Sequence, residues 1–208
     1  IIESNKSFID CECIRHPIVE RIHTETEYVT NDIHLGKENE KDGILLFGTN
    51  ACGKSTLMKS VGLNLIMAQA GLFVASRKFN YYPYSQIFTR ILNNDNIFRS
   101  QSSFAVEIQE LKSILKRSDS NSLVLGDELC SGTESISAIS IITTGLKELC
   151  QRKTSFIFTS HLHQLTTLEE VKQLKNLEIN HLKIDYDKEK DILIYDRKLA
   201  KGSGPSIY

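Results

Sequence analysis

Short apolar runs alternate with stretches of helical spacing along most of the chain. Gly43–Phe47, Ser122–Gly126 and Ser155–Thr159 are short, mainly apolar runs, a pattern typical of strands buried in a parallel sheet. Ile87–Ile91 predicts a further strand. Because strands and helices alternate, the sequence predicts an α/β fold with a mixed, largely parallel sheet flanked by helices.

Helices are predicted where apolar residues recur at steps of three and four. One helix ends near Gly71, and its periodic residues are Leu57, Met58, Val61, Leu65 and Ile66. The next has an apolar stripe of Phe104, Ile108, Leu111 and Leu115, and the third covers Ser135–Cys150. Capping boxes are predicted at Ser131 with Glu134, and at Thr166 or Thr167 with Glu169 or Glu170.

The two ends of the chain have a different pattern. Residues 1–42 are polar with short apolar runs, which predicts short strands and loops. Residues 179–186 and 191–198 are predicted as two strands joined by the charged turn 187–190. The chain therefore is expected to finish in a β-hairpin.

Composition and charge narrow the class of protein. The length of 208 residues predicts one domain, or one large domain with a small appendage. The chain is 40% hydrophobic, as is ordinary for a globular protein, and carries a net charge of −1. This balance argues against a domain that grips nucleic acid mainly through phosphate attraction. No apolar run approaches the roughly 18–20 residues that span a bilayer. Without an initiating Met or a signal-peptide pattern, the chain is expected to be an excerpt of a longer polypeptide.

The five cysteines predict free thiols in a reducing compartment, because their number is odd and they are widely spread. Cys11 and Cys13 form a C-x-C pair without the usual zinc spacing. We interpret them as ordinary strand or loop residues.

A glycine-rich segment between a predicted strand and helix carries the strongest chemical signal. It fits G-x-x-x-x-G-K-[ST] and consists of Gly48, Thr49, Asn50, Ala51, Cys52, Gly53, Lys54 and Ser55. Gly48 and Gly53 allow the backbone to curl so that amides face phosphate oxygens. Lys54 would reach the β- and γ-phosphates, and Ser55 would offer its hydroxyl to Mg²⁺. The alternative is a glycine-rich turn before an ordinary helix, which the strand and helix context disfavours.

Two acidic residues end the Ser122–Gly126 strand. Asp127 is expected to hold Mg²⁺, and Glu128 to orient and deprotonate the attacking water. A solvated strand end is the alternative interpretation. His161 follows another strand and is expected to sense the γ-phosphate or help fix the water. His163 is a less favoured candidate for the same role. His16, His23, His34 and His181 show no ligand spacing and are expected to be surface or structural residues.

Six segments in order resemble the ATPase domain of the MutS family of DNA mismatch-recognition proteins. They are Arg15–Glu20, Tyr28–Asp32, Gly48–Thr56, Ser102–Glu107, Asp127–Glu134 and Thr159–His161. The residues of Asp127–Glu134 and of the ending Gly202–Tyr208 look like those of the branch found in large DNA viruses and some animal mitochondrial genomes. The chain departs from the common family form at Cys52, Ser103 and Ser131, where relatives carry Gly, Thr and Arg.

The resemblance implies an ABC-like P-loop NTPase that binds ATP or ADP with Mg²⁺ and hydrolyses ATP. Residues 1–42 would form N-terminal strands and the adenine side, and residues 43–208 the P-loop core with its hairpin. Two copies would pack face to face, with Ser102 reaching the partner's nucleotide. Other domains would bind mismatched duplex DNA, dimerisation helices would lie beyond residue 208, and the downstream repair factors stay open. Nucleus, mitochondrion, bacterial cytoplasm and viral factory all fit such an ATPase.

The predicted site combines the residues reasoned from the motifs with those that the resemblance adds. The catalytic residues are Lys54, Glu128 and His161, and the metal ligands are Ser55 and Asp127. The nucleotide contacts are Gly48, Thr49, Asn50, Ala51, Cys52, Gly53, Lys54, Ser55, Thr56, Tyr28 and, in trans, Ser102. Tyr28 would stack on adenine, with Arg197 a candidate for the other side of the base.

Two rival functions remain open at this point. A transporter or chromosome-cohesion head would carry L-S-G-G-Q before the acidic strand, where this chain has Arg99–Ser103. A nucleotide-dependent dimerisation scaffold would bind ATP without useful hydrolysis, which Glu128 argues against. We also predict that Cys52, beside Lys54 at a helix N-terminus, favours its thiolate, so that alkylation inhibits and ATP protects.

Overall fold

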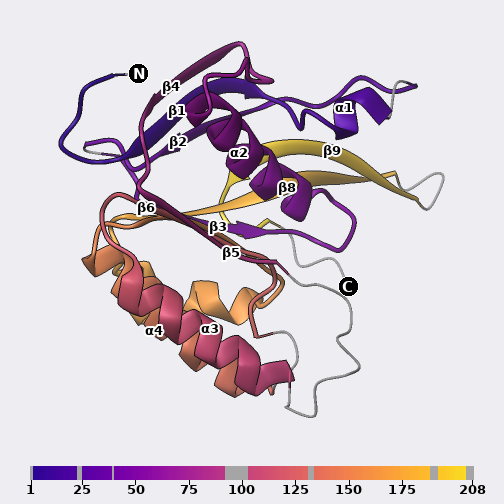
Figure 1. Ribbon diagram of the computed structural model, residues 1–208. Helices are drawn as coiled ribbons and strands as arrows, with labels where there is room; N and C mark the ends of the chain where they lie inside the picture. Colours follow the sequence, from indigo (N-terminus) through magenta and orange to yellow (C-terminus); the bar gives the residue numbers. More distant parts are fainter. Residues whose placement is uncertain are drawn as a thin grey trace.

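The computed structural model describes residues 2–22, 25–38, 40–91, 103–130, 134–187 and 192–204. Within these ranges two sheets and their helices are stacked in layers (Figure 1). The elements in order are β1 (Phe8–Ile14), α1 (Val19–Ile22), β2 (Asn31–Leu35), β3 (Gly43–Phe47), α2 (Lys54–Gln69), β4 (Lys78–Tyr82), β5 (Gln86–Arg90), α3 (Ser103–Arg117), β6 (Ser122–Gly126), α4 (Ser135–Gln151), β7 (Ser155–Ser160), the 3-10 helix η1 (His163–Thr167), α5 (Glu169–Lys172), β8 (Leu177–Asp187) and β9 (Ile192–Lys201).

The larger sheet has six strands in the order β5-β6-β7-β3-β8-β9. Neighbouring strands of this sheet pair in parallel, except that β9 runs antiparallel to β8. This confirms the predicted α/β fold with a mixed, largely parallel sheet and a C-terminal hairpin. The strands β3, β6 and β7 are buried along their whole length, as their apolar runs predict.

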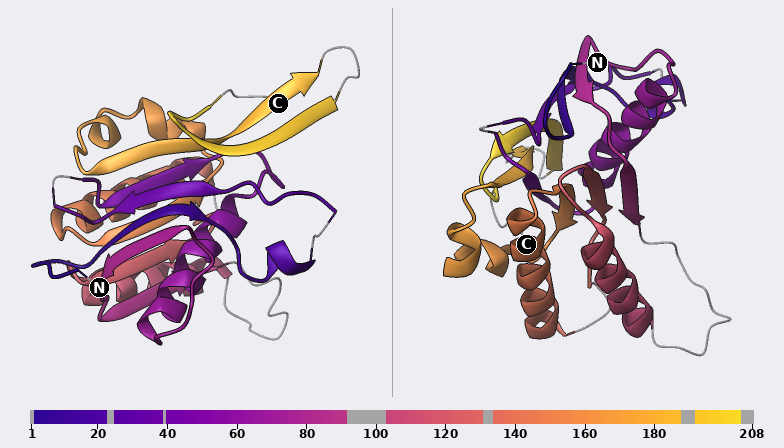
Figure 2. Two further views of the ribbon diagram at one scale, coloured as in Figure 1. Left: turned by 90° about the horizontal axis from the view of Figure 1, so that it is seen from above. Right: turned by 60° about the vertical axis from the view of Figure 1, so that its left-hand side comes forward.

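Side chains on alternate positions of the central strands belong to two separate cores. In β3, Ile44 and Leu46 pack with α2 and the smaller sheet, whereas Leu45 and Phe47 pack with α3, α4 and α5. Figure 2 shows the layers of sheets and helices from two further directions, with α3 and α4 side by side. The strand ends that carry the chemistry are therefore fixed from both faces.

The smaller sheet is antiparallel, with β1 between β2 and β4. Neither β4 nor the one-turn helix α1 was predicted. Strand β4 shows only a short alternation, in which Phe79 packs on the first core and Tyr81 is buried. Helix α1 begins where His16 Nδ1 accepts hydrogen bonds from the amides of Ile18 and Val19.

The predicted capping boxes are wrong where the structure describes them. Helix α4 has Glu134 itself as N-cap, so Glu134 is not at the third helical position, and Ser131 lies outside the described residues. Helix α5 begins after Leu168 without a side-chain cap. The hydroxyls of Thr166 and Thr167 donate instead to carbonyls within η1. A local backbone acceptor competes with the capping geometry in this short segment.

No helix among the described residues is long and apolar enough to cross a membrane. The turn predicted at residues 187–190 includes residues 188–190, which lie outside the described part.

Candidate nucleotide-binding site

The glycine-rich segment forms a loop between β3 and α2, at the carboxyl end of the sheet. Gly48 and Gly53 have φ angles of 149° and 108°, which favour glycine. A Cβ atom on Gly48 would also lie 2.6 Å from the Cys52 sulfur. Gly53 is the N-cap of α2 and provides no side-chain cap. The first amides of α2 therefore lack side-chain acceptors and are available to an anion.

Lys54 is held at this loop by oxygen atoms on two sides. Its side chain is only 4% exposed. The Nζ donates hydrogen bonds to the carbonyls of Gly48 and Thr49 at 2.7 and 3.1 Å, and lies 3.4 Å from Glu128 Oε1. A buried ammonium needs such partners because it has lost its water. Each of these contacts can be exchanged for a phosphate oxygen of a bound nucleotide.

Asp127 and Glu128 follow β6 and are held by the hydroxyl groups of Ser55, at the start of α2, and Thr159, in β7. Ser55 Oγ donates to Asp127 Oδ1 at 2.8 Å, and Thr159 Oγ1 donates to the same oxygen at 2.6 Å. The amide of Glu128 donates to Thr159 Oγ1 at 2.9 Å. Because β3, β6 and β7 are adjacent and parallel, their carboxyl ends bring these groups together.

Thr159 was not predicted as a site residue. Its hydroxyl contacts both acidic residues: it donates to the side chain of Asp127 and accepts from the main-chain amide of Glu128. The available signal was its place in the T-x-H segment, two positions before His161. Only the pairing of β6 with β7 shows what the hydroxyl touches.

The two histidines after β7 lie in different surroundings. His161 is exposed, and its ring makes no hydrogen bond with any residue that the structure describes. The His163 ring stacks on Phe47 with centroids 5.2 Å apart. Burial, together with the charges of His161 and Lys54, lowers the pKa of His163. The role predicted for His161 stays a prediction, and His163 packs on a core side chain, as expected of a structural residue.

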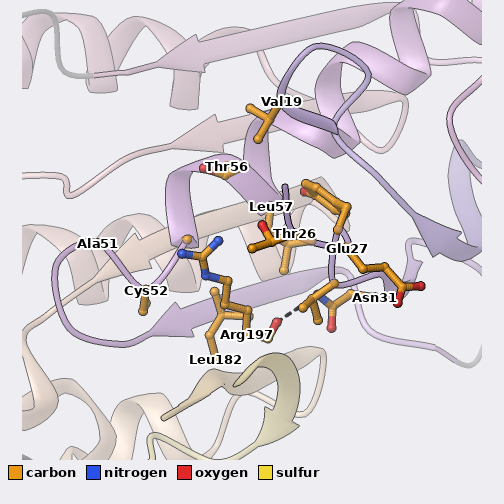
Figure 3. Close-up of a pocket in the computed structure, with 13 residues that line it drawn as sticks. Val19, Thr26, Glu27, Asn31, Ala51, Cys52, Thr56, Leu57, Leu182 and Arg197 are labelled. Atoms are coloured by element: carbon orange, nitrogen blue, oxygen red, sulfur yellow. Dashed lines mark hydrogen bonds between the residues drawn. The ribbon is translucent and has the colours of Figure 1, made fainter. Parts of the chain in front are cut away.

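A cavity of about 380 Å³ opens beside the loop, within the range of small-molecule sites. Its lining includes Tyr28 and Arg197, which come from segments far apart in the sequence. Figure 3 shows Arg197 directed toward the loop residues Ala51 and Cys52. Thr56 at the start of α2 also lines it. The cavity is therefore continuous with the phosphate-facing loop and is suited to a nucleoside.

Asn31 fixes the irregular stretch of β9 that carries Arg197. Asn31 Nδ2 donates to the Arg197 carbonyl at 3.1 Å (Figure 3). The Leu199 amide donates to Asn31 Oδ1 at 2.7 Å. Arg197 has a φ of 61°, which is uncommon outside glycine. Sequence reasoning noted Asn31 only as part of a segment and did not predict this contact.

A family model for MutS domain V matches residues 44–208. The chain belongs to the MutS domain V family. This confirms the predicted family, which is the ATPase domain of MutS mismatch-repair proteins, and with it the ABC-like P-loop fold. The match separates the chain from transporter and chromosome-cohesion heads.

Similar full-length proteins agree with this family. A putative DNA mismatch repair protein of Acanthamoeba polyphaga mimivirus, a mutS homolog, is 45% identical over 97% of this chain. The mitochondrial mutS homolog of Sarcophyton glaucum is 40% identical over 99% of it, and MutS of Finegoldia magna 39% over 93%. The alignments cover 21%, 20% and 22% of these relatives, so the chain spans about a fifth of their length. The first two relatives fit the predicted viral and mitochondrial branch.

The structure brings together most residues of the predicted site. The loop residues, Lys54, Ser55, Asp127 and Glu128 are linked by the contacts above, and Tyr28 lines the adjoining cavity. Asn50 is exposed at the loop surface. Ser102 lies outside the described residues, as does Ser131.

The prediction that Cys52 favours its thiolate is wrong. The Cys52 side chain is fully buried, with an exposed fraction of 0%. Burial raises the pKa of Cys52 and outweighs the neighbouring Lys54, which lowers it. The loss of water around a thiolate costs more here than one ammonium group returns.

We therefore expect Cys52 to react slowly with iodoacetamide at pH 8, both with and without ATP. The raised pKa leaves little thiolate at that pH, and the buried sulfur is out of reach. Peptide mapping by mass spectrometry checks this, with the half-buried Cys13 as the internal comparison. Labelling of Cys52 as fast as that of Cys13 would contradict the expectation.

Proposed function

We propose that this chain binds Mg-ATP in the loop between β3 and α2 and hydrolyses it with water directed by Glu128. The observation that carries the proposal is the joined set of contacts between the P-loop and the acidic pair. Lys54 lies 3.4 Å from Glu128, and Ser55 donates to Asp127 at 2.8 Å. Phosphate-binding groups and acidic groups therefore occupy one small volume at the strand ends.

Lys54 would exchange the two loop carbonyls for oxygens of the β- and γ-phosphates. The loop amides and the start of α2 would hold the remaining phosphate charge. The base would enter the cavity beside Tyr28 and Arg197, with Thr56 next to it. His161 would sense the γ-phosphate from the end of β7.

Mg²⁺ fits the oxygen donors that the chain offers. Ser55 Oγ and Asp127 Oδ1 lie 2.8 Å apart, and both are hard ligands of the kind this ion takes. When bound, Mg²⁺ neutralises charge on the phosphate oxygens. Thr159 would keep Asp127 in place by its 2.6 Å hydrogen bond.

Glu128 would accept a proton from the attacking water and orient it toward the γ-phosphate. Its φ of 46° is uncommon for a residue with a side chain and directs the carboxylate back toward Lys54. A scaffold that only dimerises on ATP would have no use for this conformation. The geometry therefore supports hydrolysis better than binding alone.

We further propose that two copies of the chain pack face to face, with Ser102 completing the partner's site. Other domains of the full-length protein would bind mismatched duplex DNA, as the names of the relatives suggest. Nucleotide binding and hydrolysis would then close and release the dimer and change the grip on DNA.

The test is single-turnover cleavage of radiolabelled ATP by the full-length protein at increasing protein concentration. A composite site predicts that the rate constant rises with concentration until dimers are saturated. Cleavage at a constant rate would contradict the shared site, and binding without cleavage would favour the scaffold.

A further inference from the structure

Glu107 is a buried carboxylate that the proposed chemistry does not use. It lies in the second turn of α3 and is only 4% exposed. Its Oε1 accepts a 2.8 Å hydrogen bond from the amide of Cys130. This bond joins α3 to the turn that follows Asp127 and Glu128.

That turn has an unusual backbone that needs support from its surroundings. Glu128 and Cys130 have φ angles of 46° and 60°, and neither is glycine. Such conformations are uncommon for residues that carry a side chain, and they persist where neighbouring groups impose them. Leu129 and Cys130 are both buried, so the Cys130 amide cannot turn to water. Glu107 supplies the acceptor that this amide requires.

Charged side chains surround Cys130 at the end of this turn. Burial first, and then the charge of Glu107, raise the pKa of Cys130 to about 11, while Arg90 acts in the opposite direction. Arg90 also lies 3.0 Å from Glu110 on α3 by its Nε, an ion pair whose angle leaves Nε without a hydrogen bond. The Arg90 carbonyl accepts the amide of Asp127 at 2.8 Å.

Helix α3 thus contacts the acidic segment by two routes. Glu107 holds the far side of the turn directly, and Glu110 reaches the near side through Arg90. The direct route is buried, whereas Glu110 is about half exposed. A buried hydrogen bond between fixed partners transmits a displacement better than a solvated ion pair.

We propose that Glu107 is a positioning residue that couples α3 to the Asp127–Cys130 turn and so sets where the Glu128 carboxylate points. The inference rests on the proposed function, because it concerns the aim of the hydrolytic base. Helix α3 begins immediately after Ser102, which is proposed to meet the nucleotide of the partner copy. A shift of α3 on dimer closure would therefore reach Glu128 through one hydrogen bond.

The experiment compares Glu107→Met and Glu107→Gln in the full-length protein. Methionine fills a similar volume without a strong acceptor, and glutamine keeps a carbonyl oxygen for the Cys130 amide. We measure kcat for ATP hydrolysis and, by calorimetry, the Kd for Mg-ATP. Lys112→Gln is the matched control, since it removes a charge from an exposed position of the same helix that belongs to neither route.

For Glu107→Met, kcat is expected to fall about 10–100-fold, the effect typical of groups that orient a ligand or base from outside the first contacts. The Kd for Mg-ATP should stay within roughly twofold of the wild-type value, because Lys54 and its loop are untouched and distant sites act nearly independently. Glu107→Gln should restore most of kcat, and Lys112→Gln should leave it unchanged.

Three results would overturn the proposal. They are a normal kcat in Glu107→Met, an equal loss in Glu107→Met and Glu107→Gln, or a weakened Kd that accounts for the whole loss. A wild-type protein that binds Mg-ATP but never cleaves it would instead contradict the proposed function. The binding measurement also shows that each variant is folded.

Discussion

Lys54→Ala is expected to abolish the thermal stabilisation that Mg-ATP gives to the full-length protein. At a ligand concentration of 100 times Kd, binding stabilises the native state by about 2.7 kcal/mol. For a domain of this size that corresponds to a rise in Tm of roughly 5–10 °C. Without the Lys54 ammonium group, the phosphates lose the positive charge that binds them, so the nucleotide-dependent shift in Tm should vanish. Differential scanning fluorimetry measures each variant against its own nucleotide-free Tm.

Lys59→Ala is the matched control for this loss. Lys59 lies in the same helix, five residues after Lys54, and the substitution removes the same group. Its nucleotide-dependent shift should equal that of wild type. A wild-type shift in Lys54→Ala would show that Lys54 does not bind the phosphates. If titration of the wild-type protein with Mg-ATP gave no heat in calorimetry, the proposed nucleotide site would be contradicted.

Glu128→Gln is expected to keep Mg-ATP binding and to lose turnover. General base catalysis contributes about 10²–10⁴-fold, so kcat should fall by that factor. Binding should be kept or strengthened, because Glu128 Oε1 lies 3.4 Å from Lys54 and competes with phosphate for it. Phosphate release measures kcat, and calorimetry measures Kd.

The control is Glu148→Gln, which changes the same group on the surface of α4. Glu148 pairs with Arg152 far from the nucleotide loop and is 38% exposed, so kcat should stay at the wild-type value. Unchanged turnover in Glu128→Gln would take Glu128 out of the base role. In that case a different group must direct the water.

The strands and long helices of the central layer could be predicted because their signals are local. Gly43–Phe47 is apolar throughout and becomes β3 with the same limits. The stripe around Leu57 and Val61 predicts α2, although its helix begins at Lys54 and includes the loop lysine. The strand β4 was missed because its Phe79 and Tyr81 alternate over too few residues, and pairing with β1 decides its conformation.

The phosphate-binding chemistry of the loop could also be predicted from the sequence, but the pKa of Cys52 in that loop could not. The motif spacing places Lys54 and Ser55 at the start of a helix wherever it folds. The thiol of Cys52 was misjudged because its pKa depends on burial, and burial is a property of the packed core. A charged neighbour is visible in a sequence, whereas the loss of water is not.

The sequence by itself determined the family, the layered α/β fold and the order of phosphate-binding and acidic segments, because glycine spacing, apolar runs and adjacent carboxylates act over a few residues. Tertiary structure alone decided that Thr159 bridges both acidic residues, that Asn31 holds Arg197 over the cavity and that Glu107 supports the turn after β6. These contacts join residues 32, 166 and 23 positions apart. Hydrogen bonds of this kind depend on strand pairing and burial, and the sequence spacing of the joined residues predicts neither of them.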